Sequence, residues 1–415
     1  AEDGIRDYKV TGVQTCALPI CGQLAWMLAE AAQRRQMALQ VQTPSREDPA
    51  VGLAAGVVEA SVRDVAGTAE LATRCSAISF ENEWIDLEGL APLAAQGVQF
   101  VPSLKALQPL VCKRNQRELL QRLNLPSPRW FPLTSACPTP SKTTPPSAGQ
   151  PALPEGFQFP LMAKAATGGY DGKGTAVLRG PEDLVALIAR VDPANWIVEE
   201  FVEFEQELAL VAARDRFGEV VCLPLVQTHQ HEQVCDWVLA PVEASHALQQ
   251  AARNIAASLL TSLDYVGVLS LEFFYGRRGL LINELAPRTH NSGHYSIEAS
   301  SCSQFDLQLL CVSGQAAVEP SLVVPGALMV NLLGFEQRSA DDPEADYGDK
   351  RQALAALADA HLHWYGKRGS SPGRKLGHLT VLLRSTDPQE RRHEAMERLQ
   401  EVRSIWPLPG GTAAA

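Results

Sequence analysis

The chain has 415 residues, of which 46% are hydrophobic and 20% are charged, so it is long enough for two or three domains with a sizeable core. Its formal net charge of −11 argues against a nucleic-acid binder, which usually carries a basic face, and no apolar run reaches the roughly 18 residues of a membrane span. Nine cysteines, none in a Cys-x-x-Cys or zinc spacing, predict reduced thiols in a cytoplasmic protein.

Residues 21–104 alternate between helix-like and strand-like segments. Residues 24–37 are rich in alanine and predict a helix. Strands that alternate with helices indicate a parallel, doubly wound sheet, and ligands bind beyond the carboxyl ends of such strands. Gln23 and Glu81 occupy positions of this kind, so both are predicted to lie near a substrate. Three short strands are predicted, at residues 38–41, 77–81 and 98–101.

Residues 105–318 are predicted to form a central domain, and residues 319–405 a small C-terminal domain that opens with a strand at 327–334. The central domain begins with a helical connector, for which a helix is predicted over residues 103–123. Residues 132–154 contain seven prolines and predict an extended surface insertion without a packed core.

A glycine-rich loop follows a predicted strand at residues 159–164 and precedes another at 175–178. Glycine adopts positive φ readily, so the backbone N–H groups of such a loop can approach a polyphosphate closely, and lysines at both ends add positive charge. The loop lacks the Gly-Lys-Ser/Thr of a Walker A motif, and a glycine hairpin without a ligand is the alternative. Its residues are Gly168, Gly169, Tyr170, Asp171, Gly172, Lys173 and Gly174.

An apolar strand at residues 196–202 ends in acidic residues, and Glu207 follows it. Such a segment can offer backbone groups to an adenine ring and a carboxylate to ribose hydroxyls. Strands often end in acidic residues without any such role, so this pattern alone is weak. The residues of this predicted hinge are Glu199, Glu200, Phe201 and Val202.

Two carboxylates, Glu272 and Glu284, lie 12 positions apart on predicted antiparallel strands at residues 266–274 and 280–285. A short reversal places them side by side, where they repel unless a cation intervenes. Mg²⁺ suits such a pair, because it takes one or two carboxylates and fills its other positions with phosphate oxygens. Two solvated acids on a hairpin are the alternative. A group of basic and amide residues follows the second acid: Arg288, His290, Asn291, Ser292 and His294.

Taken in order, the lysine, glycine loop, acidic hinge, strand glutamate and Asn-Glu pair resemble the ATP-grasp superfamily of ligases. Within it, the chain is similar to the N5-carboxyaminoimidazole ribonucleotide synthetases over about residues 21–385. The most specific blocks are Asn-Ser-Gly-His at 291–294 and Pro-Gly-Arg-Lys-Leu-Gly-His at 372–378. Further matches are Gly-Gln-Leu at 22–24, Phe-Glu-Asn at 80–82, Gly-Tyr-Asp-Gly-Lys-Gly at 169–174 and Trp-Tyr-Gly-Lys at 364–367.

The resemblance implies an α/β and α+β fold of ATP-grasp architecture, with an N-terminal doubly wound domain, a central ATP-grasp domain and a small β-rich C-terminal domain. It implies an ATP-dependent carbon–nitrogen ligase of de novo purine synthesis, which carboxylates 5-aminoimidazole ribonucleotide with bicarbonate through carboxyphosphate. Mg²⁺ is the implied metal, with Mn²⁺ as the alternative. The implied partners are these small molecules and a second copy of the chain in a homodimer.

The resemblance also implies roles for individual residues. Glu272 and Glu284 would hold the metal, with Asn283 beside them. The lysines and the glycine loop would contact the phosphates of ATP, and the hinge its adenosine. The implied ATP-binding residues are Lys113, Lys164, Gly168, Gly169, Gly172, Lys173, Gly174, Glu199, Glu200, Phe201, Val202, Glu207 and Asn283.

For the other two substrates, the resemblance implies four catalytic residues. Tyr170 and Asp171 would face the aminoimidazole ring. Arg288 and His290 would lie at the bicarbonate and carboxyphosphate position. Lys367 and Arg374 would clamp the ribonucleotide phosphate. The implied substrate-binding residues are Gln23, Leu24, Glu81, Asn291, Ser292, His294, Lys367, Arg374 and Lys375.

The chain also departs from the family. Residues 1–20 do not match the apolar first strand and Gly-Gly-Gly-Gln loop of its members, and we expect them to be an artefact of cloning or sequence assembly. A poor strand over residues 12–18 is the alternative. Ser371 stands where many relatives have arginine, and a nucleotide-contacting histidine of relatives falls near residues 229–231 without a clear counterpart.

Two other functions stay open at this point. One is another ATP-grasp ligase, such as a formate-using glycinamide ribonucleotide transformylase or a biotin-carboxylase-like enzyme, against which the Asn-Ser-Gly-His block argues. The other is a nucleotide-binding protein inactivated by its altered N-terminus.

Overall fold

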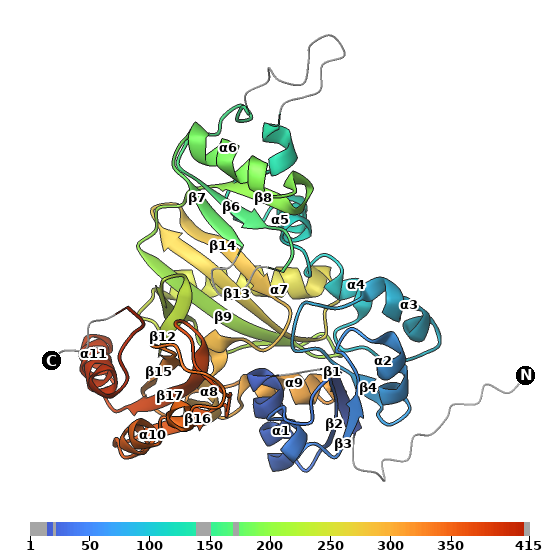
Figure 1. Cartoon of the computed structure of the whole chain (residues 1–415), viewed down its shortest axis with the longest axis vertical. Coiled ribbons are helices and arrows are strands. Elements are labelled where there is room, and N and C mark those ends of the chain that lie inside the picture. The colour runs from blue at the N-terminus through green and yellow to red at the C-terminus, as the bar shows by residue number, and fades with distance from the viewer. Residues whose placement is uncertain (1–14, 20–21, 138–150, 169–173, 411–415) are drawn as a thin grey trace, which may run out of the picture.

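The computed structural model describes residues 15–19, 22–137, 151–168 and 174–410, which are organised around three β-sheets (Figure 1). The N-terminal sheet is parallel, with the order β3-β2-β1-β4. Its strands are β1 (Thr15–Pro19), β2 (Ala38–Thr43), β3 (Gly56–Glu59) and β4 (Ala77–Ile78). Its helices are α1 (Gln23–Arg34), η1 (Val51–Leu53), α2 (Val65–Ala72) and α3 (Leu87–Ala95).

β1 lies inside the segment that does not resemble the family. It pairs in parallel with β2, from Thr15 opposite Ala38 to Pro19 opposite Gln42, and with β4 on its other side. A strand therefore forms within residues 1–20, in agreement with the second of the two expectations for this segment.

Two predicted strands of the N-terminal domain are shorter than expected. The strand predicted at residues 77–81 ends at Ile78, and beyond it the Glu81 carboxylate accepts a hydrogen bond from the Ala25 N–H, at 2.7 Å. The strand predicted at 98–101 contributes a single bridge between Phe100 and Ile78.

The single helix predicted over residues 103–123 was wrong. The structure has two helices there, α4 (Leu104–Leu107) and α5 (Lys113–Arg122). Pro109 explains the interruption, since its nitrogen carries no hydrogen and cannot donate a helical hydrogen bond.

A small antiparallel sheet follows, with the order β5-β8-β6-β7. Its apolar face packs against α6 and η2 through buried residues that include Leu161, Val198 and Leu184. Of the predicted proline-rich insertion, residues 138–150 lie outside the described residues. The elements are β5 (Trp130–Pro132), η2 (Leu133–Ala136), β6 (Leu161–Ala165), β7 (Thr175–Leu178), α6 (Pro181–Arg190), η3 (Pro193–Asn195) and β8 (Trp196–Glu200).

The large sheet runs without a break from the centre of the molecule into the C-terminal region, in the order β14-β13-β9-β11-β12-β15-β17-β16, with β10 beside β9. β15 pairs with β12, so the C-terminal strands extend the central sheet (Figure 1). The strands are β9 (Gln206–Arg214), β10 (Val220–Cys222), β11 (Val226–His231), β12 (Val234–Ala240), β13 (Gly267–Gly276), β14 (Gly279–Ala286), β15 (Gly326–Leu333), β16 (Ala360–Trp364) and β17 (Lys375–Leu383).

Helices cover both faces of this sheet. On one face α7 packs on Leu269 and Leu271 of β13, and on the other α9 packs on Val268. In the C-terminal region Trp406 is completely buried beside Tyr347. The helices are α7 (His246–Ser262), η4 (Asn291–Gly293), α8 (Ser296–Ala299), α9 (Gln304–Val312), η5 (Pro343–Asp346), α10 (Gly348–Ala355) and α11 (Pro388–Ile405).

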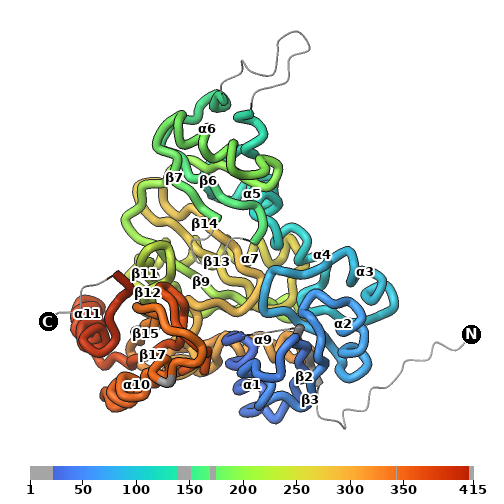
Figure 2. Tube along the Cα trace, viewed as in Figure 1, coloured from blue at the N-terminus to red at the C-terminus, as the bar shows by residue number. Residues whose placement is uncertain are grey.

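The N-terminal region packs against the central region through α1 and α9, which lie side by side (Figure 2). Arg35, just after α1, forms an ion pair of 3.0 Å with Asp306 in the first turn of α9. Of the helices that the structure describes, none combines the length and apolar character needed to cross a bilayer.

Candidate active site

Glu272 on β13 and Glu284 on β14 are direct cross-strand partners, as the sequence predicted. The two strands are joined by a two-residue turn between Gly276 and Gly279. The backbone at Gly279 has φ of +75°, a conformation that favours glycine. Opposite residues share one face of a sheet, so both carboxylates project from the same face. Their side chains are 26% and 43% exposed, so both carboxylates are only partly buried.

The electrostatics of this pair show an excess of negative charge. Burial, the carboxylate of Glu284 and that of Glu207 together raise the pKa of Glu272 to about 7. Burial also acts to raise the pKa of Glu284, but Lys113, whose Nζ lies 2.5 Å from its Oε1, outweighs burial and lowers that pKa. Nearby cations, Lys113 foremost, thus compensate the charge of Glu284, whereas the charge of Glu272 is compensated less completely.

Behind the pair, a buried ion network joins the small sheet to β14. The Glu199 side chain is 2% exposed and accepts from Arg117 Nε at 2.6 Å and Lys164 Nζ at 2.9 Å. Arg117 also donates to the backbone oxygens of Ile282 and Asn283, and Lys164 donates to the Asn283 side chain. Burial acts to raise the pKa of Glu199, but the two cations outweigh it and hold the pKa at about 2.

Arg117 was not predicted from the sequence. A signal for it exists, because Arg117 lies four residues after Lys113 on α5, and residues four apart share one face of a helix. The same network changes the expectation for Glu199. Its carboxylate is committed to Arg117 and Lys164, so this carboxylate is not available to a ligand.

The rest of the predicted hinge is more exposed. Glu200 pairs with Arg129 and Arg278, and the Phe201 side chain is largely exposed. Val202, which follows β8, is partly buried. Glu207 lies on β9, where burial raises its pKa to about 7 and His229 acts in the opposite direction. His229 itself stacks on Trp237 of the neighbouring strand.

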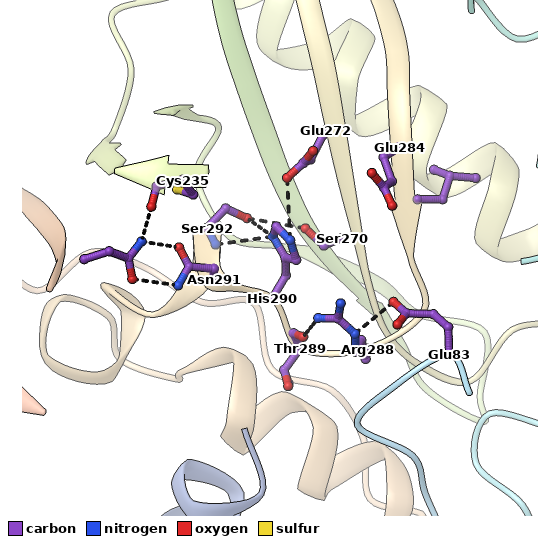
Figure 3. A network of polar contacts seen from close by, with 12 residues as sticks. Glu83, Cys235, Ser270, Glu272, Glu284, Arg288, Thr289, His290, Asn291 and Ser292 are labelled. Atoms are coloured by element: carbon purple, nitrogen blue, oxygen red, sulfur yellow. Dashed lines mark hydrogen bonds and ion pairs between the residues drawn. The ribbon is translucent and has the colours of Figure 1, made fainter. Parts of the chain in front are cut away.

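The turn after β14 brings basic groups to the acidic pair (Figure 3). His290 Nε2 lies 3.5 Å from Glu272 Oε1, and its Nδ1 accepts from the Ser292 backbone N–H at 3.3 Å. Because an amide N–H can only donate, Nδ1 is the acceptor and the proton of the neutral ring lies on Nε2, facing Glu272. Burial, Arg288 and Lys375 lower the pKa of His290, which keeps the ring neutral.

Arg288 is held by a residue from the N-terminal region. Its Nε donates to Glu83 Oε1 at 2.9 Å, and its Nη1 donates to the Thr289 backbone oxygen at 3.0 Å (Figure 3). Glu83 was also missed from the sequence, although it lies only two residues after Glu81, which was predicted.

Two residues of the turn point away from the acids. Asn291 and Asn331 of β15 exchange hydrogen bonds through their side-chain amides, at 3.0 and 2.7 Å. His294 is completely buried between Phe305 and His378. The structure therefore brings Arg288, His290 and Ser292 together near the acidic pair. Asn291 and His294 instead contact the residues that pack behind the turn.

The predicted ribonucleotide residues come from both ends of the chain and meet. Lys367 Nζ donates to Gln23 Oε1 at 2.8 Å and to the Lys375 backbone oxygen at 2.7 Å. Arg374 Nη1 donates to the backbone oxygens of Arg368 and Gly369. Leu24, on α1, packs against the N-terminal core.

The predicted glycine loop lies largely outside the described residues. Gly168 and Gly174 have φ of +76° and +85°, and the Ala165 N–H donates to the Gly174 oxygen at 2.7 Å, so the ends of the loop form a hairpin. The predicted residues that lie outside the described part are Gly169, Tyr170, Asp171, Gly172 and Lys173.

Three family models match the chain. They are the ribonucleotide synthetase preATP-grasp domain at residues 17–110, the ATP-grasp domain at 119–305 and the phosphoribosylaminoimidazole carboxylase C-terminal domain at 327–392. Together with the geometry above, these matches place the chain among the ATP-grasp ligases, which use ATP.

Relatives narrow the class further. The N5-carboxyaminoimidazole ribonucleotide synthase of Synechococcus elongatus is 47% identical over 388 residues, which is 94% of each chain. The chain belongs to the N5-carboxyaminoimidazole ribonucleotide synthase family. The crystal structure of the Aspergillus clavatus synthase complexed with ATP has a TM-score of 0.81 at 27% identity, and covers 94% of this chain and 98% of that one. The synthase of that fungus in complex with ADP and 5-aminoimidazole ribonucleotide matches equally well.

The buried network yields a first prediction. Replacing Arg117 with Met leaves Glu199 paired with Lys164 alone, and we expect the free energy of unfolding to fall by about 3 kcal/mol at neutral pH. Because the pKa of Glu199 is depressed in the folded state, its stabilisation is full above its ordinary pKa of 4.5 and is lost as the pH falls towards 2. The difference between the two proteins should therefore shrink as the pH falls below 4.5.

Urea unfolding followed at several pH values measures this difference. Arg122→Met is the control, because Arg122 lies on the same helix and is exposed. Equal, small losses in both variants would show that the network adds nothing to stability.

Proposed function

We propose that this chain uses ATP and bicarbonate to carboxylate the exocyclic amine of 5-aminoimidazole ribonucleotide, giving N5-carboxyaminoimidazole ribonucleotide in de novo purine synthesis. One observation carries the proposal: the cross-strand pair Glu272 and Glu284 has cationic groups around it, since Lys113, Lys164 and Arg288 act on Glu284, and His290 lies beside Glu272. Phosphate transfer to bicarbonate needs that combination, because two anions have to be brought together. The ATP complex and the ADP and ribonucleotide complex of the Aspergillus clavatus synthase support the same substrates.

ATP would lie between the small sheet and the end of the large sheet. Lys113 and Lys164 would contact its phosphates, under the glycine loop of residues 168–174. The backbone of residues 199–202 would hold the adenine, and Glu207 the ribose. Asn283 supports this arrangement, because it accepts from Lys164 and directly precedes Glu284.

Mg²⁺ fits the residues present. The carboxylates of Glu284 and Glu207 both repel that of Glu272, and Lys113 compensates only part of this negative charge. Among the described residues no group of three or more His, Cys, Asp or Glu side chains could hold a metal on its own. Two carboxylates suit Mg²⁺, with Mn²⁺ as the alternative, because this metal can be bound by Glu272 and Glu284 and take phosphate oxygens in its remaining positions. When bound, the metal would offset negative charge on the transferring phosphoryl group.

The residues of the turn would act on the anions. A bicarbonate oxygen attacks the terminal phosphorus of ATP, the bond to the bridging oxygen breaks, and ADP leaves with carboxyphosphate formed. Arg288 supplies positive charge, and His290 supplies a neutral N–H donor at that position, as its Nε2 proton allows. Carboxyl transfer to the substrate amine then releases phosphate, which takes up the amine proton. Tyr170 and Asp171 would face the aminoimidazole ring.

The ribonucleotide would bind where both ends of the chain meet. Lys367 and Arg374 would clamp its phosphate, with Lys375, Gln23 and Leu24 beside them. Glu81, Asn291, Ser292 and His294 would shape the site. We also propose a homodimer in the cytoplasm, on the basis of the family resemblance and the unpaired cysteines.

The direct test is ADP release from the purified protein with ATP, Mg²⁺ and bicarbonate, with and without 5-aminoimidazole ribonucleotide. We expect strong stimulation by the ribonucleotide, since carboxyphosphate has an acceptor only when it is bound. Formate with glycinamide ribonucleotide serves as the control for the other ATP-grasp ligase. Stimulation by that pair alone, or ATP binding without any stimulation, would contradict the proposal.

Glu284→Gln tests the metal assignment. The amide keeps the shape of the side chain but removes its charge, so we expect turnover to fall by more than about 100-fold while the fold is retained. Turnover at saturating Mg²⁺ and circular dichroism measure the two effects. Glu155→Gln, at an exposed acid, is the control. Turnover near that of the unmodified protein would refute the assignment.

Lys367→Ala tests the phosphate clamp. A charge-assisted hydrogen bond contributes roughly 1.5–3 kcal/mol, so we expect the KM for the ribonucleotide to rise by about 10-fold or more while the KM for ATP stays the same. Steady-state kinetics with each substrate varied in turn separate the two constants. Lys105→Ala, at an exposed lysine of α4, is the control. A change confined to the KM for ATP would disprove the clamp.

A further inference from the structure

Gln304, the first residue of α9, is completely buried against the turn that carries His290. The helix start that bears it is firmly held. Ser303 and Asp306 form a capping box, in which each side chain bonds the backbone N–H of the other, and Asp306 also pairs with Arg35. The Gln304 amide therefore projects from a fixed point of the scaffold.

This amide pairs with both backbone groups of His290. Its Oε1 accepts from the His290 N–H at 2.8 Å, and its Nε2 donates to the His290 oxygen at 2.8 Å. His290 has an extended backbone, with φ of −136° and ψ of 157°. The side chain of Gln304 thus bonds this residue as a neighbouring strand would, and it fixes the direction in which the His290 side chain leaves the backbone.

The same amide also reaches the far end of the turn. Gln304 Nε2 lies 3.0 Å from His294 Nδ1, and an amide nitrogen can only donate, so Nδ1 accepts and the proton of the neutral His294 ring lies on Nε2. In addition, the Gln304 backbone N–H donates to Ser296 Oγ, which donates to the Gly293 oxygen at 2.5 Å. One residue therefore holds the beginning and the end of residues 290–294.

The turn is shaped to admit this amide. A Cβ atom at Gly293 would lie 2.6 Å from Gln304 Oε1 and 2.7 Å from its Cδ, which is closer than real contacts allow. Any side chain at this position would displace the amide from His290. The glycine is thus required by the approach of Gln304.

We propose that Gln304 is a positioning residue for the carboxylation step, a role that rests on the proposed function. It holds the His290 backbone so that the ring, fixed on its other side by Ser292, points its Nε2 proton at the position beside Glu272. Carboxyphosphate is short-lived in water, so a donor misplaced by about 1 Å would let it hydrolyse before transfer. The residues proposed to contact ATP form no hydrogen bond with Gln304 among those that the described part of the chain shows.

Gln308 offers a matched control. It lies one turn further along α9, is equally buried and also bonds a backbone N–H, since its Oε1 accepts from Val268 at 2.7 Å and its Nε2 donates to Ser79. It does not contact residues 290–294 in any hydrogen bond that the described part of the chain shows. Gln304→Met and Gln308→Met remove the same polar atoms at similar volume, so both should lose comparable unfolding free energy.

For Gln304→Met we expect the kcat of carboxylation to fall by about 100-fold, the KM for ATP to change by less than about threefold, and more ADP to be released per carbamate formed. The carbamate is measured by NMR with isotopically labelled bicarbonate. Gln308→Met should keep its kcat and its coupling. Equal kinetic effects in the two variants, or a kcat for Gln304→Met within about threefold of the unmodified protein, would overturn the proposal.

Gln304→Glu covers the case in which the Met variant does not fold. A buried, protonated carboxyl can keep both bonds to His290 and loses only the one to His294, so this variant should retain more activity than Gln304→Met. If Gln304→Glu folds but is no more active than Gln304→Met, this would contradict the proposal that the Gln304 side chain holds the His290 backbone.

A direct structural readout separates this proposal from the proposed function. Nitrogen NMR of histidine-labelled protein reports which ring nitrogen carries the proton, and His294 should carry it on Nε2 in the unmodified protein and in Gln308→Met, but lose that fixed state in Gln304→Met. An unmodified protein without ribonucleotide-dependent ADP release would defeat the proposed function alone. The same His294 signal in all three proteins would contradict the proposal that Gln304 holds residues 290–294 in place.

Discussion

Two carboxylates fixed side by side on neighbouring strands, Glu272 and Glu284, are the constraint around which the rest of the site is arranged. Like charges in a partly buried position repel, and each makes the other harder to ionise. The hairpin cannot relieve this repulsion, because the register of the strands fixes both backbones. Positive charge therefore has to come from outside the hairpin. The structure supplies it from α5, through Lys113, and from the turn after β14, through Arg288.

The cations around the pair are themselves anchored by other carboxylates. Lys164 and Arg117 meet at Glu199, and Arg288 meets Glu83. Buried charges are tolerated only when they are paired and hydrogen-bonded, so each pair ties together the elements that carry it. The Glu199 network joins the small sheet to β14, and the Arg288 pair joins the N-terminal region to the turn that follows this strand. The same ion pairs therefore balance the charge of the site and hold the three regions together.

The strand and turn pattern of the sequence, without the family resemblance, predicted the parts of this arrangement that are close together along the chain. The hairpin of Glu272 and Glu284 is such a part, because strand pattern and a short turn determine it. Arg117 and Gln304 were missed because their hydrogen-bond partners, Glu199 and His290, are brought to them only by tertiary packing. The position of each residue on its helix does not reveal these partners. The broken connector was a different kind of error, because Pro109 was a visible local signal that the helical pattern around it obscured.

The C-terminal strands contribute to the site by supporting it from behind. β15 continues the central sheet, and its Asn331 engages the Asn291 amide in two hydrogen bonds, while His378 of β17 packs against His294. This turn contains only the short helix η4, and a single helical turn has few backbone hydrogen bonds of its own to hold it. Gln304 holds this turn from one side and the extended sheet holds it from the other. The small C-terminal region is thus part of the frame of the site, because its strands are continuous with the strands that carry the acidic pair.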